Sequence, residues 1–365
     1  MTKQTDILII GGGISGLLTA REFVLAGKSV TLVERGVPGQ ESSWAGGGIL
    51  LPIYPWRQAE AISSLVLASL ESYPHLSETL FEATGIDPEL QVCGMLICEN
   101  PDFEVAKNWC QRHQIRYNHP ALTLLQDIQC PYTDPLWLPD IAQIRNPRLL
   151  KSLLSFLIQQ GVRFVEHAKI QRIDIHQNVI QHIKINDETL SAEQVILCAG
   201  AWTQDFLSRW LPESSIKLDI QPVRGQMLVF DAQPDTLSPM ILSGDHYLIP
   251  RRDGKILAGS TVEHVGFEKV TTEPARNELY NFATRLLPKL KQYPVSAHWA
   301  GLRPGTPEGI PYIGFHPDIE NLSINAGHFR NGLIMGPASA QLLADLILNR
   351  SPKLDAIPYR LTRPL

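Results

Sequence analysis

An arginine and a tyrosine in the second half of the chain carry side chains that can hold a carboxylate. The planar guanidinium of Arg303 matches a carboxylate with two parallel hydrogen bonds, and the phenol of Tyr247 offers a further donor. Arg330 is a third candidate, either at the same group or at the entrance to its pocket. An arginine more often forms a surface or structural ion pair, so residue type alone does not assign these roles.

The glycines near the N-terminus indicate where a nucleotide would lie. Gly11, Gly13 and Gly16 form a G-x-G-x-x-G pattern between an apolar run at 7–10, expected to be a buried strand, and a helical pattern that Gly27 ends. In such a turn the first glycine permits the tight bend, the second lets a pyrophosphate approach the backbone, and the third lets the helix pack on the strand. The N-terminus of the helix, at Ile14 and Ser15, presents free N–H groups to phosphate.

A second strand is expected at 30–33, and it ends at Glu34, 18 residues past Gly16. A carboxylate at this place accepts hydrogen bonds from ribose hydroxyls and disfavours a 2′-phosphate, which argues against NADP. The alternative is a glycine-rich turn in some other α/β protein. The motif predicts a dinucleotide site, but it does not choose between FAD and NAD.

Residues 41–51 form a second segment rich in serine and glycine. Ser42 and Ser43 could donate hydrogen bonds to phosphate or ribose, and three glycines at 46–48 would let a flat ring lie against bare backbone. Alone, this segment would be interpreted as a flexible loop. Beside the first motif, a contact with the cofactor is the better interpretation.

Together these segments resemble the D-amino acid oxidase-like family of FAD enzymes, which includes glycine oxidases, monomeric sarcosine oxidases and small amine dehydrogenases. The resemblance is carried by GGGISGLLTA, VER and SSWAGGGIL, by the strand and small residues at 195–202, and by Y-x-x-P-x-x-D-G at 247–254. The motifs W-A-G-x-R-P at 299–304 and G-H-x-x-N-G at 327–332 resemble those of glycine oxidases most closely. The resemblance favours FAD over NAD.

The resemblance also implies the fold and its division. We expect an α/β protein with a Rossmann-like FAD-binding domain and a second, α+β substrate (cap) domain built on an antiparallel sheet. The FAD-binding domain would be discontinuous, comprising residues 1–56, 145–215 and 300–365. The cap would comprise residues 57–144 and 216–299.

Residue by residue, the resemblance implies a cofactor site and a substrate anchor. The anchor would consist of Arg303, Tyr247 and Arg330. A helix beginning near Gly332 would direct its positive end at the reduced flavin, the alternative being an ordinary loop before a C-terminal helix. Cofactor contacts are expected from Gly11, Gly13, Ile14, Ser15, Gly16, Glu34, Arg35, Ser42, Ser43, Ala45, Gly46, Gly47, Ile170, Ala199, Gly200, Trp202, Gly327, His328, Arg330, Asn331, Gly332 and Leu333.

The implied reaction is oxidation of glycine and other small amino acids, such as sarcosine and small D-amino acids, by hydride transfer to FAD, with O2 reduced to H2O2. Supply of the glycine imine for thiamine thiazole assembly would follow. His246 and His328 could act as bases, but amine oxidation needs a neutral nitrogen rather than a protein base, so we assign no catalytic residue. Residues 305–315 lack the cysteine that binds flavin covalently in sarcosine oxidases, so noncovalent FAD is expected.

Three other functions remain open. An amine or D-amino acid dehydrogenase of the same fold would pass electrons to an acceptor other than oxygen. A flavin domain acting on tRNA would be expected to have a basic surface, which the net charge of −5 does not favour. A flavoprotein without catalysis would not need both Arg303 and Tyr247.

Bulk composition sets the remaining expectations. The 365 residues suffice for two domains, and 44% hydrophobic with 19% charged residues is ordinary for a soluble enzyme. Five cysteines without a C-x-x-C pattern suggest reduced thiols, and the first strand leaves no room for a secretory leader. We therefore expect a cytoplasmic protein without a nucleic-acid, membrane or metal partner. A homo-oligomer remains open.

Three local predictions concern the segments between the motifs. Residues 57–84 look helical, with a break at Pro74. The alternating run at 92–98 predicts a pair of strands joined by a turn at Gly94. Asn146 is expected to cap a helix that has Pro147 in its first turn.

Overall fold

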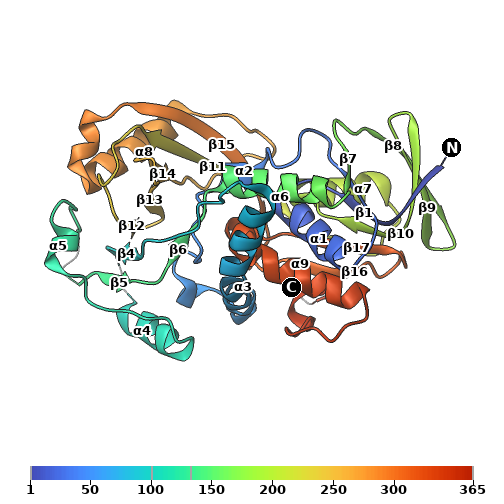
Figure 1. Cartoon of the computed structure of the whole chain (residues 1–365), viewed down its shortest axis with the longest axis horizontal. Coiled ribbons are helices and arrows are strands. Elements are labelled where there is room, and N and C mark those ends of the chain that lie inside the picture. The colour runs from blue at the N-terminus through green and yellow to red at the C-terminus, as the bar shows by residue number, and fades with distance from the viewer. Residues whose placement is uncertain (1, 100–101, 132–133, 364–365) are drawn as a thin grey trace.

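The computed structural model describes residues 2–99, 102–131 and 134–363. Two large sheets lie at opposite ends of the long axis with helices between them (Figure 1), and a third sheet has two strands. The first sheet has the strand order β16-β17-β10-β1-β2-β7, and the β8–β9 hairpin joins it through β10. Strands β1, β2, β7, β10 and β17 run parallel. The strands are β1 (Thr2–Ile10), β2 (Val30–Val33), β7 (Arg163–Val165), β8 (Ile170–His176), β9 (Val179–Ile185), β10 (Glu188–Leu197), β16 (Tyr312–Phe315) and β17 (Leu322–Ala326).

Strand β1 shows why this sheet is buried on both faces. Ile7 and Ile9 enter one hydrophobic core, whereas Leu8 and Ile10 enter another, as the alternation of side chains along a strand requires. The first core is completed by four helices, α1 (Ile14–Leu25), α3 (Glu60–Thr84), α6 (Asn146–Gln159) and α9 (Gly332–Ile347). The second core includes residues of α7 (Thr203–Trp210) and of the β8–β9 hairpin. The predicted α/β class is confirmed.

The second sheet has the order β15-β11-β14-β13-β12-β4-β5. Its neighbours are antiparallel except for the parallel pair β12–β4. The strands are β4 (Met95–Ile97), β5 (Leu136–Leu138), β11 (Gln221–Phe230), β12 (Met240–Ser243), β13 (His246–Pro250), β14 (Ile256–Gly259) and β15 (Val295–Gly305). The expected boundary between residues 299 and 300 falls within β15.

Shorter elements complete the chain. Helix α8 (Glu273–Leu286) packs on one face of the second sheet, and α4 (Phe103–Arg112) and α5 (Leu122–Leu125) lie at its outer edge (Figure 1). Strands β3 (Gln91–Val92) and β6 (Ala142–Gln143) form a two-stranded sheet. The remaining elements are α2 (Ser42–Ala45) and the 3-10 turns η1 (Pro55–Arg57), η2 (Gly200–Trp202), η3 (Pro288–Gln292), η4 (Phe329–Asn331) and η5 (Ile357–Tyr359).

The predicted break at Pro74 is wrong, because α3 continues through that residue from Glu60 to Thr84. A proline inside a helix removes one hydrogen bond. Here the helix is held by its buried face, where Leu65, Tyr73 and Leu80 are almost fully inaccessible. Burial over so many turns outweighs the lost bond.

Two further local predictions need correction. Gly94 lies between the two strands of 92–98 with φ +70°, but no turn is assigned there and the strands do not pair with each other. Strand β3 pairs with β6, whereas β4 pairs with β5 and β12. Asn146 is the first residue of α6 and not its N-cap, which is Arg145, and the helix has no side-chain capping bond. The amide nitrogen of Asn146 donates to the carbonyl of Ser43 at 2.7 Å.

Among the residues that the structure describes, no helix combines the length and the hydropathy needed to span a bilayer.

Candidate active site

One cavity of about 690 Å³ lies between the two sheets, and most of the predicted site residues line it. Gly16 and Gly327 do not. The predicted residues that line it are Gly11, Gly13, Ile14, Ser15, Glu34, Arg35, Ser42, Ser43, Ala45, Gly46, Gly47, Ile170, Ala199, Gly200, Trp202, Tyr247, Arg303, His328, Arg330, Asn331, Gly332 and Leu333. Residues more than three hundred positions apart in sequence therefore face one space.

The turn between β1 and α1 requires its glycines. Gly11 has φ +113°, and a Cβ there would lie 2.3 Å from the carbonyl oxygen of Cys198. A Cβ on Gly16 would lie 2.0 Å from the carbonyl oxygen of Gly11, so Gly16 serves helix packing and does not reach the cavity. The helix begins at Ile14, whose N–H donates to the hydroxyl of Ser43 at 2.8 Å.

Glu34 holds this end of the cavity together. One of its oxygens accepts from the N–H of Gly12 at 2.7 Å, and the other accepts from that of Gly36 at 2.9 Å. Each carboxylate oxygen keeps a further acceptor site. Next to Glu34, the guanidinium carbon of Arg35 lies 3.6 Å from the ring centroid of Trp202. The two side chains therefore stack on each other beside the carboxylate.

The glycine-rich segment at 46–48 lies in close contact with the second sheet. A Cβ on Gly47 would lie 2.7 Å from Cδ1 of Ile249 and 3.2 Å from Cε2 of Tyr247. The carbonyl of Ala45 accepts from the indole of Trp299 at 3.0 Å. These contacts bring the segment after α2 against β13 and β15.

Ile170 begins β8, and Gly200 begins the η2 turn directly after β10, so both contribute backbone to the cavity wall. Near the C-terminus, Gly327 has φ +87°, and a Cβ on it would lie 2.8 Å from Cγ2 of Thr306. It therefore shapes the turn that leads to α9. The N-terminus of that helix, at Gly332 and Leu333, faces the cavity.

His328 is buried and electrically neutral. Its Nε2 lies 3.0 Å from the hydroxyl of Ser339, which itself donates to the carbonyl of Gly336. Because that hydroxyl has only one proton, Nε2 of His328 is the donor in the first bond. Burial lowers the pKa of His328 to about 4. His246 bonds to Glu278 at 2.9 Å and does not line the cavity.

Arg303 is a cation that faces the cavity without a matching carboxylate. Its Nη1 donates to the carbonyls of Thr261 at 3.0 Å and Arg224 at 3.4 Å, and its Nη2 donates to the hydroxyl of Ser260 at 2.8 Å. Burial lowers its pKa to about 10, so it remains charged at neutral pH. It forms no ion pair with any described residue, which leaves it available to an anionic ligand.

Tyr247 and Arg330 lie near this cation. Tyr247 is buried and helps to sustain the charge of Arg303, whereas the charge of Arg330 opposes it. Within the described part of the chain, the guanidinium of Arg330 donates a single long bond of 3.5 Å, to the carbonyl of Asp245. Two arginines and one phenol thus gather at one end of the cavity.

The cavity fits a dinucleotide on structural grounds. Its glycine turns lie where a Cβ would collide with backbone, and the N-terminus of α1 opens onto it. The buried Oδ1 of Asn146 lacks a hydrogen-bond partner and belongs to a residue of the same wall. Within the described ranges, no cluster of three or more metal-binding side chains occurs.

Several residues of the site were missed in the sequence. Gly225 lies under Arg303, Ser260 bonds to it, and Arg251 holds the loop at Gly47. The sequence could have indicated only Arg251, because the alternation of side chains along a strand places it on the same face as Tyr247. The other two depend on contacts between strands that are distant in sequence.

The comparisons with known proteins agree with this geometry. The family model described as FAD dependent oxidoreductase matches residues 6–346. A glycine oxidase of Pseudomonas putida is 42% identical over 98% of both chains. A bifunctional ThiO/ThiG protein of Synechocystis is 32% identical over 98% of this chain but only 54% of its own length. The crystal structure of the Geobacillus kaustophilus glycine oxidase superposes with a TM-score of 0.92 over 100% of both chains at 25% identity. The chain therefore belongs to the family of FAD-dependent oxidoreductases.

Proposed function

We propose that the protein is an FAD-dependent oxidase of glycine and other small amino acids, among them sarcosine and small D-amino acids. Relatives that are 42% and 40% identical over nearly the whole chain bear the name glycine oxidase. The family supports the use of FAD. The two arginines that line one end of the cavity support a carboxylate substrate.

The observation that carries the proposal is that no described carboxylate pairs with Arg303; Glu263, whose charge acts on it, pairs with Arg224. The described partners of Arg303 are all neutral oxygens, yet it lines the cavity. An amino acid carboxylate would supply the missing negative charge and accept two parallel hydrogen bonds. The hydroxyl of Tyr247 and the guanidinium of Arg330 then complete the anchor from two other directions.

The anchor would act by orientation. It holds the carboxylate end of the substrate, so the α-carbon has one position relative to the cofactor edge. Apolar walls from Ile49, Leu51 and Met227 limit the size of the substrate and exclude water. No protein base is assigned, because a substrate bound with a neutral amine needs none.

When bound, FAD would supply the two-electron acceptor for the α C–H bond and the route by which those electrons reach O2. Glycine, O2 and H2O thereby give glyoxylate, NH3 and H2O2, with water adding to the imine after oxidation. The proposed cofactor site comprises the cavity residues that were expected to contact FAD. Gly16 and Gly327 would shape the backbone next to this site without lining it, and the division into an FAD-binding and a cap domain stays a prediction.

We extend the proposal to thiamine biosynthesis. The ThiO/ThiG relatives support this extension, although this chain spans about half of their length. In that role the imine of glycine, or its hydrolysis product, would be the useful product and H2O2 the by-product.

The test is oxygen-dependent peroxide release from purified holoenzyme with glycine, sarcosine, D-alanine, D-proline and L-proline. The proposal expects turnover with glycine and the small D-amino acids. Flavin bleaching under anaerobic substrate without peroxide in air would instead identify a dehydrogenase. Neither signal with any of the five compounds would refute the substrate class.

A further inference from the structure

Arg251 lies next to the hairpin strand that carries Tyr247, and it faces the same way. Tyr247 and Ile249 both approach Gly47, as the Cβ distances show. Two positions further on, Nη2 of Arg251 donates to the carbonyl of Gly47 at 2.7 Å. Side chains two positions apart on an extended chain point to the same side, so Tyr247, Ile249 and Arg251 share one face. Arg251 itself is only 8% exposed.

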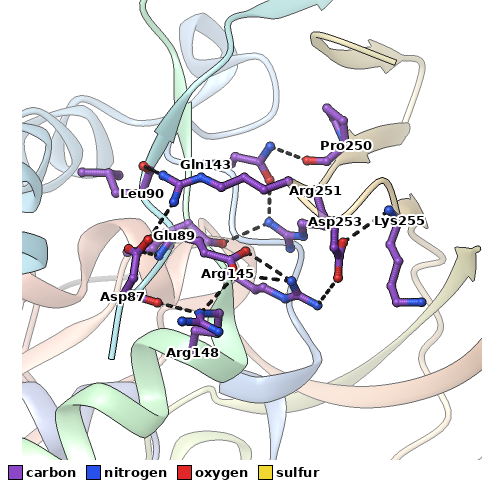
Figure 2. Close-up of polar contacts among 12 residues, drawn as sticks. Asp87, Glu89, Leu90, Gln143, Arg145, Arg148, Pro250, Arg251, Asp253 and Lys255 are labelled. Carbon is purple, nitrogen blue, oxygen red and sulfur yellow. Dashed lines mark hydrogen bonds and ion pairs between the residues drawn. The ribbon is translucent and has the colours of Figure 1, made fainter. Parts of the chain in front are cut away.

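The same guanidinium binds a third part of the chain. Its Nη1 donates to Oε1 of Gln143 and to the carbonyl of Ile144. The amide of Gln143 returns a bond to the carbonyl of Pro250, as Figure 2 shows. The N–H of Ile144 donates to the carbonyl of Gly48 at 2.8 Å. Arg251 therefore ties the loop at 46–48, the segment before α6 and the end of β13 into one unit.

Nearby carboxylates do not neutralise Arg251. The carboxylates of Glu89 and Asp253 both form ion pairs with Arg145, at 3.2 Å and 2.9 Å. Glu89 also pairs with Arg148 (Figure 2). The described partners of Arg251 are neutral oxygens, and burial lowers its pKa to about 10, so it is still protonated at neutral pH. A buried cation without a counter-ion is costly for stability, but it is a strong and directional donor to a carbonyl.

The held carbonyl determines the direction of an amide donor. In a trans peptide the C=O and N–H bonds point in opposite directions. With the Gly47 carbonyl turned to Arg251, the N–H of Gly48 points away from it. Gly47 and Gly48 both line the cavity, and in the described part of the chain neither donates its N–H to an acceptor. The loop therefore offers donors to a ligand.

We propose that Arg251 is a positioning residue for the bound flavin. Its hydrogen bond to the Gly47 carbonyl holds the loop at 46–48 against Tyr247. The cofactor and the substrate anchor are therefore positioned by the same rigid unit. The inference rests on the proposed function in placing FAD beside this loop. Arg251 touches neither FAD nor substrate, and its effect passes through Gly47.

The test compares Arg251→Lys and Arg251→Met with Arg252→Met. Arg252 is a matched control, because it adjoins Arg251 and belongs to the same polar network. It bonds instead to Asp87 and to the carbonyl of Leu90, each at 2.7 Å, and it is exposed. Apoprotein of each variant is titrated with FAD, and the Kd, the visible flavin spectrum and the melting temperature of the apoprotein are recorded.

Arg251→Lys keeps the charge but not the fork that reaches three carbonyl-type oxygens. We expect its apoprotein to melt near the wild-type temperature while the Kd for FAD rises about tenfold or more and the flavin bands shift. Arg251→Met should show a larger change, and Arg252→Met should keep the Kd within about twofold.

Two results would overturn the proposal. One is a wild-type Kd and spectrum in Arg251→Lys. The other is an equal loss in Arg252→Met, which would make the whole network merely structural. If Arg251→Met does not fold, the Kd for FAD and the flavin spectrum of Arg251→Lys still test the proposal. None of these readouts uses an amino acid, so a wrong substrate assignment would not affect them.

Discussion

The guanidinium of Arg303 lies directly against the α-carbon of Gly225. A Cβ built on Gly225 would lie 2.1 Å from Nη1, 2.2 Å from Nη2 and 2.3 Å from Cζ of the arginine. The two residues face each other across the β11–β15 pair, two register positions apart. The place of the proposed carboxylate anchor thus depends on the absence of one side chain on the neighbouring strand.

Gly225→Ala should therefore displace Arg303 without removing it. We expect kcat/KM for glycine to fall about tenfold or more, mainly through a higher KM, while FAD affinity is retained. Steady-state peroxide assays and FAD titration measure the two effects. Gly36→Ala is a suitable control, because a Cβ there would have only one neighbour, at 3.8 Å. Unchanged kinetics in Gly225→Ala would mean that the arginine tolerates displacement.

Arg303→Ala removes the anchor itself. Loss of a bidentate charged pair should lower kcat/KM for carboxylate substrates by about 10² to 10⁴. Arg303→Lys should recover part of that loss, because it restores the charge without the fork. Kinetics of the two variants on glycine check this, and a wild-type kcat/KM in Arg303→Ala would exclude Arg303 as the anchor.

His328 should make the stability of the protein depend on pH. The unfolded chain binds a proton at this histidine near its ordinary pKa of 6.5, whereas the folded chain binds it only near 4. Acidification between these values therefore favours unfolding, by up to about 3 kcal/mol, and the effect is absent above pH 6.5. Urea unfolding of the apoprotein at several pH values gives the free energy of unfolding as a function of pH. In this window, that free energy should change less with pH in His328→Gln than in the wild type. An identical slope in the variant would assign the pH dependence to other groups.

The flavin should be released by denaturation. Residues 305–315 contain no cysteine, and the cavity wall offers backbone amides and hydroxyls for binding. After precipitation with acid, the yellow colour should appear in the supernatant with the mass of intact FAD. Colour retained in the pellet would show a covalent bond.

The local patterns allowed much of the fold to be predicted. The turn at Gly11 depends on neighbouring residues and occurs where the sequence places it. The Asp253-Gly254 dipeptide of the motif at 247–254 lies in the loop of the β13–β14 hairpin. The helix at α9 likewise begins at Gly332 as expected. Pro74 was misjudged because tertiary burial of α3 is not visible in the residues around it.

The site was predictable only in part, for a similar reason. The glycines of the first turn are recognisable by their spacing, as at Gly11, which bends the chain, and Gly16, which lets the helix pack on the strand. Gly225 makes room for a side chain 78 positions away, and no local pattern reports that contact. Strand alternation places Arg251 on the face of Tyr247, but it does not show that Arg251 is buried under the loop at Gly47 while Arg252 is exposed. Which of two adjacent arginines is buried depends on the strands that surround them.

Anaerobic mixing of the holoenzyme with glycine, followed by admission of oxygen, tests the proposed oxidase most directly. We predict that glycine bleaches the visible flavin absorbance, and that oxygen restores the absorbance with release of one equivalent of H2O2 per flavin. Bleaching that oxygen does not reverse would contradict the oxidase. A flavin that stays oxidised with glycine, while it is reduced by dithionite, would contradict glycine as the substrate.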